Sequence, residues 1–313
     1  MITVKENGNR LLIKCSVSEF SFCMTYCEHK IPFYLGDIRP PVHVESEIRK
    51  SIGSIFHSKE EKKDKEKVKP ITKEELSVAL PDKQKSIEFT REHVFSKLSY
   101  SMSKDNKNIQ LMLTGRPDKL LRKDEFLIVE EDKFPKNPFL YVDRKSPFDS
   151  HILQSLIYLN SKFSIIHNSP KKEIEKEIDR YINHNNTINT STCCPQGTIN
   201  MFFDMVNDNS SYQNVNEQYS AKAEYCLNDW FDIPHLKKKW IVNIRNSESE
   251  DTENNIVKMF EGIQNENDEI FLQEKMSRFV SLVLDKEQKY HHGNFKKCIP
   301  CEYAGICKFS LNT

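Results

Sequence analysis

The 313-residue sequence lacks any long apolar run: its longest runs, such as LLI at 11–13 and FLIV at 126–129, hold three or four residues. A helix that spans a bilayer needs about 20 apolar residues, so no transmembrane helix is expected. The first residues, MITVKENGNRLLIK, also lack the apolar core and the small-residue cleavage site of a secretory signal. The sequence therefore predicts an intracellular protein that does not enter a membrane.

A net charge is absent as well, because 46 Lys and Arg residues balance 46 Asp and Glu residues. Any contact with nucleic acid must therefore depend on local basic patches. A dinucleotide-binding fingerprint such as G-x-G-x-x-G is missing, which argues against an electron carrier or redox sensor. What is present, 37% hydrophobic and 29% charged residues, is typical of a folded globular protein.

The pattern of apolar residues predicts an α/β fold. Residues 109–133 alternate or run apolar, with breaks at 115–117 and 122–125, which indicates two strands joined by a tight connection. A further strand is predicted at 240–245. Amphipathic helices are predicted at 44–67, 148–163, 171–182 and 252–289.

The chain is predicted to form a core that is interrupted once. Residues 1–163 would form its first part, and residues 241–313 would supply the last core strand, a long helix and a cysteine-rich end. Residues 164–240, rich in Asn, Ser and Thr, predict an insertion of unknown role. The long helix is inferred from an apolar stripe that includes Ile256, Met259, Phe260, Phe271, Met276, Phe279 and Val283.

Three charged residues in the strand region have the composition of a hydrolytic metal site. Asp118 follows the break after the first strand, and Glu131 and Lys133 stand two positions apart in the next, where they point to the same face. Two carboxylates can hold Mg²⁺ or Mn²⁺ with several waters retained, and such a metal activates a bound water. From these residues alone, ordinary surface ion pairs in a lysine-rich chain stay an open explanation.

Three of the nine cysteines gather near the end of the sequence, in CIPCEYAGIC at 298–307. In a reducing cytosol such a cluster more often binds a metal than forms disulfides. A tetrahedral site needs a fourth ligand, for which Cys15, Cys23 and Cys27 are the upstream candidates. The C-x2-C-x5-C spacing allows either Zn²⁺ or a four-iron four-sulfur cluster.

Six short motifs occur in one order along the chain. They are CEHKIPFYL at 27–35, GSIFH at 53–57, GRPD at 115–118, VEEDK at 129–133, QSLIY at 154–158 and CIPCEYAGIC at 298–307. With these motifs the chain resembles the RecB-like branch of the PD-(D/E)XK nucleases. Within that branch it is similar to the iron-sulfur exonucleases typified by the fourth CRISPR-associated protein. The motifs leave mainly residues 164–240 uncovered.

The resemblance implies a restriction-endonuclease-like core, in which helices flank a mixed central sheet. It implies that His57, Asp118 and Glu131 are the ligands of Mg²⁺ or Mn²⁺, and that Lys133 is the catalytic lysine. Helical periodicity by itself places His57 opposite the apolar stripe of its segment, where a histidine is ordinarily exposed to solvent. Imidazole nonetheless suits Mn²⁺.

The resemblance also assigns Gln154 and Tyr158 to a Q-x-x-x-Y element beside the active site. Their spacing places them on one face of a helix, where an amide and a phenol could meet substrate or steady the lysine. Without the resemblance they would be an ordinary polar edge of a core helix. Glu130 competes with Glu131 as the ligand, although only Glu131 has the same-face spacing to Lys133.

For the cysteines, the resemblance implies a four-iron four-sulfur cluster that joins the N-terminal segment to the C-terminal tail. Such a cluster would stabilise the fold without touching the substrate. Cys23, one helical turn before Cys27, is the rival for the fourth position. The implied ligands are Cys27, Cys298, Cys301 and Cys307.

Further Cys and His residues stand within or beside the predicted insertion. They are Cys193, Cys194, Cys226 and His235. A second metal site there is conceivable, but two adjacent cysteines followed by a gap of about thirty residues fit no common ligand spacing. Buried or unpaired thiols are the simpler interpretation.

The activity implied by the resemblance is that of a metal-dependent exonuclease acting on single-stranded DNA or DNA ends. Proteins of CRISPR adaptation, antiviral defence or recombination would then be its partners. Basic and aromatic residues near the motifs could bind the DNA backbone and stack on bases. These are Arg116, Lys119, Lys136 and Tyr158. An alternative is a catalytically silent subunit that binds DNA or assists assembly.

Overall fold

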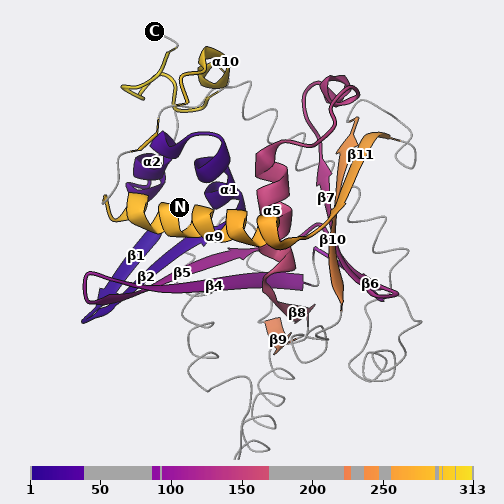
Figure 1. Ribbon diagram of the computed structural model, residues 1–313, viewed down its shortest axis with the longest axis horizontal. Coiled ribbons are helices and arrows are strands. Elements are labelled where there is room, and N and C mark those ends of the chain that lie inside the picture. Colours follow the sequence, from indigo (N-terminus) through magenta and orange to yellow (C-terminus); the bar gives the residue numbers. More distant parts are fainter. Residues whose placement is uncertain are drawn as a thin grey trace, which may run out of the picture. The chain divides into compact units, whose positions relative to one another are not determined.

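The computed structural model describes residues 2–38, 87–91, 94–168, 222–226, 236–246, 255–285, 289–290, 292–299 and 301–311. These residues form a mixed α/β structure with two mixed sheets (Figure 1), which confirms the predicted α/β class. The chain divides into two compact units, Met1–Ser161 with Pro234–Thr313 and Lys162–Ile233. The helices predicted at 44–67 and 171–182 lie outside the described residues. No helix in the described ranges is long and apolar enough to cross a membrane.

The first sheet of the larger unit contains the N-terminal strands. Its order is β1-β2-β5-β4, with β2 and β5 parallel and the other pairs antiparallel. The inward residues of β2, Leu11, Ile13 and Cys15, are buried at alternate positions, as expected for a strand with one face on the core. The strands are β1 (Thr3–Asn7), β2 (Arg10–Ser16), β4 (Val94–Lys104) and β5 (Lys107–Gly115).

The second sheet of this unit has the order β11-β10-β7-β6-β3. Strands β7 and β10 are parallel, and the remaining pairs are antiparallel. The apolar run 127–129 lies in β7, between two neighbouring strands, and all three of its side chains are buried. The strands are β3 (Ile87–Thr90), β6 (Lys119–Lys123), β7 (Phe126–Lys133), β10 (Lys237–Arg245) and β11 (Ile256–Ile263).

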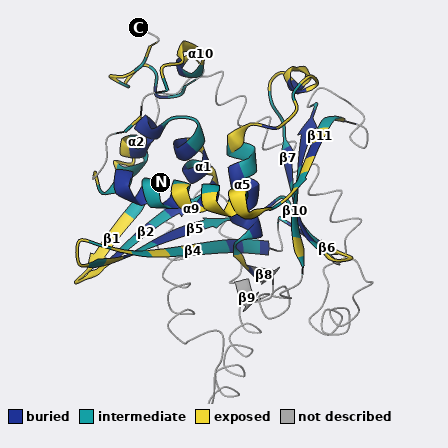
Figure 2. Cartoon of the chain, in the orientation of Figure 1, coloured by how far each residue is buried: buried dark blue, intermediate teal, exposed yellow. Residues whose placement is uncertain are grey.

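Helix α5 (Asp149–Leu159) is the centre of the larger unit. It contacts β7 and β10 of the second sheet, β4 of the first sheet, and helices α1 (Val17–Thr25) and α9 (Glu266–Val283). Figure 2 shows buried residues along α5, β7 and β10. The helix predicted at 148–163 is thus confirmed, but it ends at Leu159 and strand β8 (Lys162–Asn168) follows. In the smaller unit, β8 pairs antiparallel with β9 (Lys222–Cys226).

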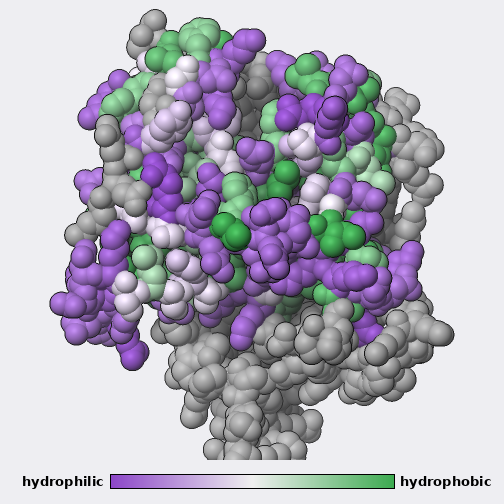
Figure 3. Space-filling model, in the orientation of Figure 1, coloured by the Kyte–Doolittle hydropathy of each residue, from purple (hydrophilic) through white to green (hydrophobic). Residues whose placement is uncertain are grey.

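The prediction of one long helix at 252–289 is wrong, because its first part is strand β11. Ile256 and Met259, two members of the predicted stripe, are 41% and 53% exposed, so they do not form a buried helix face. Helix α9 begins only after Asn265, whose side chain accepts hydrogen bonds from the N–H groups of Asn267 and Asp268. The surface that α9 crosses is mostly hydrophilic, with separated apolar spots (Figure 3).

Two further boundaries differ from the predictions. Strand β10 begins at Lys237, so the last residues of the predicted insertion 164–240 belong to the second sheet. Residues 109–133 form three strands, because KLLRK at 119–123 is a strand of its own. Its Arg122 is 1% exposed, and the charged break ascribed to this stretch is only the two-residue turn at 124–125.

Candidate functional site

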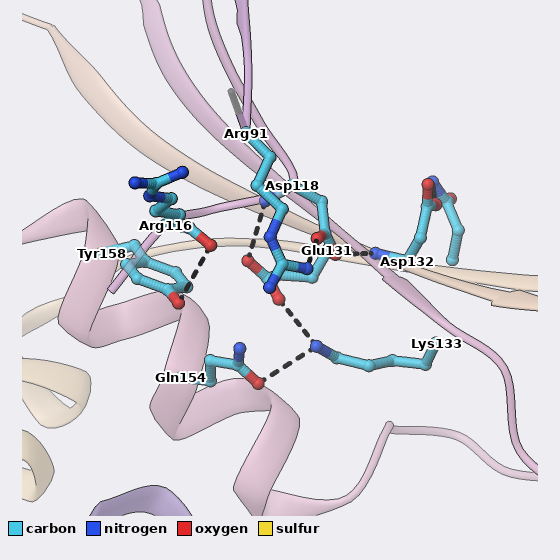
Figure 4. A network of polar contacts seen from close by, with 9 residues as sticks. Arg91, Arg116, Asp118, Glu131, Asp132, Lys133, Gln154 and Tyr158 are labelled. Carbon is cyan, nitrogen blue, oxygen red and sulfur yellow. Dashed lines mark hydrogen bonds and ion pairs between the residues drawn. The ribbon is translucent and has the colours of Figure 1, made fainter. Parts of the chain in front are cut away.

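The residues predicted as a metal site meet where β6 begins and β7 ends (Figure 4). Lys133 Nζ donates to Glu131 Oε2 at 2.7 Å, and the backbone N–H of Asp118 donates to Glu131 Oε1 at 3.4 Å. The backbone N–H of Asp132 donates to Asp118 Oδ2 at 2.9 Å. Two carboxylates and one ammonium group are therefore held at one point on neighbouring strands.

The β6–β7 hairpin produces this arrangement. Lys119 pairs with Glu130 in the ladder, so Asp118, one residue earlier, lies beside Glu131. The turn uses Asp124 with φ 53°, a left-handed conformation that Asp tolerates better than most residues. Glu131 and its contact Lys133 share a face of β7, as their spacing predicts.

The electrostatics of the site couple the acid to the lysine. Burial raises the pKa of Glu131 to about 7; the charge of Lys133 opposes that rise, and the like charge of Asp118 adds to it. Burial lowers the pKa of Lys133, but the charges of Glu131 and Asp118 outweigh it and hold this pKa above its ordinary value. The lysine is therefore a cation near neutral pH.

Helix α5 supplies the two residues of the Q-x-x-x-Y element to this location. Gln154 Oε1 accepts a hydrogen bond from Lys133 Nζ at 3.0 Å, so the lysine lies between an amide and a carboxylate. The Tyr158 hydroxyl donates to the backbone oxygen of Arg116 at 3.2 Å. A Cβ at Gly115 would lie 2.8 Å from that hydroxyl, so the close approach of α5 to the end of β5 requires glycine.

Arg91 belongs to the site but was missed from the sequence. Its guanidinium lies 3.3 Å from Asp118 Oδ1, and its backbone N–H donates to the Asp118 carbonyl oxygen at 3.0 Å. It directly follows β3, whose residues IEFT pair with β6. The alternating run IEFTR at 87–91 was the signal that could have found it, since it predicts a short strand that ends in a basic residue.

A second polar group occupies the opposite side of β7. Arg245 Nε donates to Asp132 Oδ1 at 2.7 Å, and Asn243 Nδ2 donates to the same oxygen at 3.1 Å. Asn243 Nδ2 also donates to Glu130 Oε1 at 2.5 Å. Burial raises the pKa of Glu130, and the charge of Lys119 opposes this rise. Glu130 thus contacts β10, whereas its competitor Glu131 contacts the lysine.

The other residues that the sequence predicted for DNA or metal binding beside these carboxylates differ in their placement. Among the basic residues proposed for DNA binding, Lys119 Nζ lies 3.9 Å from Glu88 Oε1, and Lys136 is exposed. His57, the third expected metal ligand, lies outside the described residues. Within the ranges that the structure describes, no three His, Cys, Asp or Glu side chains form a group that could hold a metal ion. Asp118 and Glu131 provide two oxygen-donor side chains of the kind that Mg²⁺ and Mn²⁺ prefer.

The four cysteines expected to hold a cluster come from the two ends of the chain. Burial raises the pKa of the Cys27 thiol, and the nearby thiols of Cys301 and Cys307 raise it further. Cys298 Sγ lies 3.9 Å from His292 Nε2. The Cys301 N–H donates to the Cys298 carbonyl oxygen at 3.0 Å, which folds the motif into a turn. Cys301 and Cys307 are therefore the two C-terminal thiols that influence Cys27.

The rival candidates Cys15 and Cys23 have a different environment. Both are buried, and burial raises the pKa of each thiol above its ordinary value. The largest electrostatic influences on Cys23 are Lys30, Glu19 and Cys27, which belong to the N-terminal segment. The predicted residues Cys193, Cys194 and His235 lie outside the described residues.

The C-terminal tail, which carries Cys298, Cys301 and Cys307, packs on residues 26–34. The Tyr26 hydroxyl donates to the Lys297 carbonyl oxygen at 2.5 Å, and Lys30 Nζ lies 3.5 Å from Glu302 Oε1. Glu28 accepts two hydrogen bonds from Arg278 of α9, at 2.6 and 2.8 Å. Two aromatic pairs complete the contact by stacking, Phe33 with Tyr303 at 4.5 Å and His29 with Phe309 at 4.0 Å.

Comparisons with known proteins give little further information. No model of a known protein family matches the chain. No curated protein matches it. A solved crystal structure, that of SSO0001, is similar, with 12% sequence identity and a TM-score of 0.37, covering 99% of this chain and 90% of that one.

Proposed function

We propose that this chain is a metal-dependent deoxyribonuclease with a PD-(D/E)XK core that hydrolyses phosphodiester bonds of single-stranded DNA or DNA ends. The observation that carries this proposal is the meeting of Asp118, Glu131 and Lys133 on adjacent strands, with Gln154 on the lysine. An ordinary surface ion pair would not explain it, because Glu131 is 1% exposed and burial raises its pKa, a combination that is frequent at functional sites.

In this proposal Asp118 and Glu131 hold one Mg²⁺ or Mn²⁺, with His57 as a third ligand. The donors fit such an ion, because both are carboxylates and a divalent cation would compensate the burial of Glu131. When bound, the metal supplies an activated water and stabilises charge on the phosphate. The backbone N–H of Asp132 orients the Asp118 carboxylate before any ion arrives.

Lys133 has a separate role in this mechanism. Its ammonium group is fixed by Glu131 and Gln154, and its raised pKa keeps it charged near neutral pH. A fixed cation at this place can orient the attacking water or stabilise the negative charge that grows on the phosphate. Tyr158 and Gly115 position the helix that carries Gln154.

We also propose that Cys27, Cys298, Cys301 and Cys307 hold a four-iron four-sulfur cluster, with Zn²⁺ as the competing occupant. Thiolates suit either, and the influence of Cys301 and Cys307 on the Cys27 thiol supports a shared site. The cluster would reinforce the contact between residues 26–34 and the tail, which already holds the Tyr26–Lys297 hydrogen bond.

Replacing Cys27 by Ser should remove bound iron and lower the melting temperature together, because the metal stabilises the contact between the two ends. Cys23→Ser is the matched control: it is four residues earlier in the sequence, and it should retain iron although it perturbs a buried position. Iron content and absorbance near about 400 nm are measured on anaerobically purified protein. Iron loss in the Cys23 variant alone would reverse the assignment, and one zinc without colour would exclude the cluster.

The nuclease is tested by digesting end-labelled single-stranded and duplex DNA with Mn²⁺, Mg²⁺ or a chelator. We expect cleavage with a divalent ion, none with chelator, and activity that co-elutes with the chain in gel filtration. Binding of DNA without cleavage in either ion would contradict the proposal. It would favour instead a silent DNA-binding or assembly subunit that retains a nuclease-like core.

A further inference from the structure

A pocket of about 530 Å³ lies between the loop after η2 (Pro138–Tyr141) and strands β10 and β11. Figure 1 shows this loop, which connects β7 to α5, beside β11. Trp240 and Phe260 form an aromatic wall, with Trp240 packed against the buried cluster that contains Phe260. Lys258 Nζ donates to the Val142 carbonyl oxygen at 3.1 Å and ties the strand to the loop.

The indole of Trp240 is held in place by the opposite strand. Trp240 pairs with Gly262, and a Cβ added at Gly262 would clash with Cζ2 of the indole. The ring therefore lies against bare backbone, and any larger residue at this position would displace it. An aromatic surface that is already fixed loses little conformational entropy when a ligand stacks on it.

The rim of the pocket carries more positive than negative groups. Arg144, Lys145 and Lys258 line it, against Asp143 and Glu261. Lys239, outside the lining, lies 2.8 Å from Glu261 Oε2 and compensates this carboxylate. The cations thus surround an aromatic surface, a combination that suits a chain of bases and phosphates.

The Arg144 guanidinium is itself ordered by its neighbours. It lies 4.2 Å from the centre of the Phe148 ring, and its Nε donates to the Ser146 carbonyl oxygen at 3.1 Å. Phe148 is 45% exposed beside it. A charged group that is stacked in this way is preorganised for an anionic partner.

The loop that lines the pocket connects two elements of the carboxylate site, β7 and α5. It starts after Lys133 and leads directly into α5, which carries Gln154. His151 of α5 stacks on Tyr141, with ring centres 6.3 Å apart. Burial, together with the charges of Lys133 and Arg144, lowers the pKa of His151 to about 3. The charges of Lys133 at the carboxylate site and of Arg144 at the pocket thus both act on His151.

We propose that this pocket binds a nucleobase of single-stranded DNA, stacked on Trp240, while Arg144, Lys145 and Lys258 hold the flanking phosphates. The inference deepens the proposed nuclease function, since the pocket would guide the strand next to the cleavage site. Binding itself requires neither a metal ion nor cleavage. It can therefore be tested separately from the activity.

The test uses the fluorescence of Trp240 in a Trp230→Phe background, which leaves one of the two tryptophans of the chain. A twelve-residue oligothymidylate is titrated in the presence of chelator, and total binding is followed by anisotropy of the labelled oligonucleotide. We expect saturable quenching of Trp240 that tracks the anisotropy.

The double variant Arg144→Gln/Lys145→Gln, on an exposed loop, should weaken binding about tenfold and flatten its salt dependence. Lys107→Gln, on the other sheet, should not.

Loss of stacking is tested by Trp240→Leu, which should weaken the affinity about 5- to 100-fold, as expected for one base. Binding of the oligonucleotide that is detected by anisotropy but causes no change in Trp240 emission would overturn the proposal. Equal quenching by oligoglutamate would overturn it too, because stacking would then play no part. Quenching that depends on protein concentration without DNA would assign the pocket to a second copy of the chain. Quenching without cleavage would support the pocket proposal and contradict the nuclease function. Cleavage without quenching would support the nuclease function and contradict the pocket proposal.

Discussion

Replacing Lys133 by Met should lower the rate of metal-dependent DNA cleavage by about 10²- to 10⁴-fold while leaving Mn²⁺ binding in place. The lysine touches both Glu131 and Gln154, so it is held at the carboxylates without being a metal ligand itself. Its removal also withdraws the charge that opposes the high pKa of Glu131. Cleavage and metal binding are therefore compared well above that pKa, where Glu131 is ionised in both proteins.

Two comparison variants separate the roles at this site. Asp118→Asn should lose Mn²⁺ affinity and cleavage together, because an amide is a weaker ligand than a carboxylate. Lys123→Met removes an exposed lysine from the same hairpin and should change neither. Equal loss of Mn²⁺ binding in the Lys133 and Asp118 variants would contradict a separate role for the lysine. Full activity in the Lys133 variant would reject the proposed mechanism altogether.

The placement of Asp118, Glu131 and Lys133 could be anticipated because it depends on local geometry. Side chains two apart on a strand share a face, and a short hairpin sets one strand end beside the other. Gln154 and Tyr158 were assigned to the site by the family resemblance alone, since their spacing shows only a shared helix face; the structure places both beside it. What the sequence did not indicate is that KLLRK forms the intervening strand.

The misassigned segment at 256–263 shows why periodicity alone was insufficient there. Ile256, Met259 and Phe260 satisfy helical spacing, yet pairing with β10 makes this segment a strand. Gly262 was the contrary signal, because a glycine that gives room to Trp240 is typical of close backbone approach in a strand. The pairing partner lies across the sheet and cannot be deduced from the segment itself.

The polar group behind β7 depends on the same long-range pairing. Ile241 lies opposite Glu130 and Asn243 lies opposite Asp132 only because β10 adds parallel to β7 in this register. Two polar residues at alternate positions of WIVNIR were visible, Asn243 and Arg245, and a polar face on a buried strand is a warning of a buried network. Their partner Asp132, more than a hundred residues away, could not be identified from the sequence.

That network leads to the largest expected effect on stability. Replacing Arg245 by Met should lower the free energy of unfolding by about 3 to 5 kcal/mol, because the buried carboxylate of Asp132 loses its charged partner. Both side chains of the pair are more than nine-tenths buried, and Arg245 also donates to Asn255 at 2.8 Å. Urea denaturation near neutral pH, with the slope checked for two-state behaviour, measures the change.

The cause of this loss can be isolated by two further variants. Lys237→Met, on the same strand, breaks an exposed pair with Glu125 whose side chains are 56% and 58% exposed, and should cost less than about 1 kcal/mol. The double variant Arg245→Met/Asp132→Asn should recover much of the loss, because no unpaired buried charge remains. Additive losses in the double variant would show that Arg245 stabilises by packing alone. Since the N–H of Asp132 also orients Asp118, recovered stability without recovered cleavage would separate the fold from the alignment of the site.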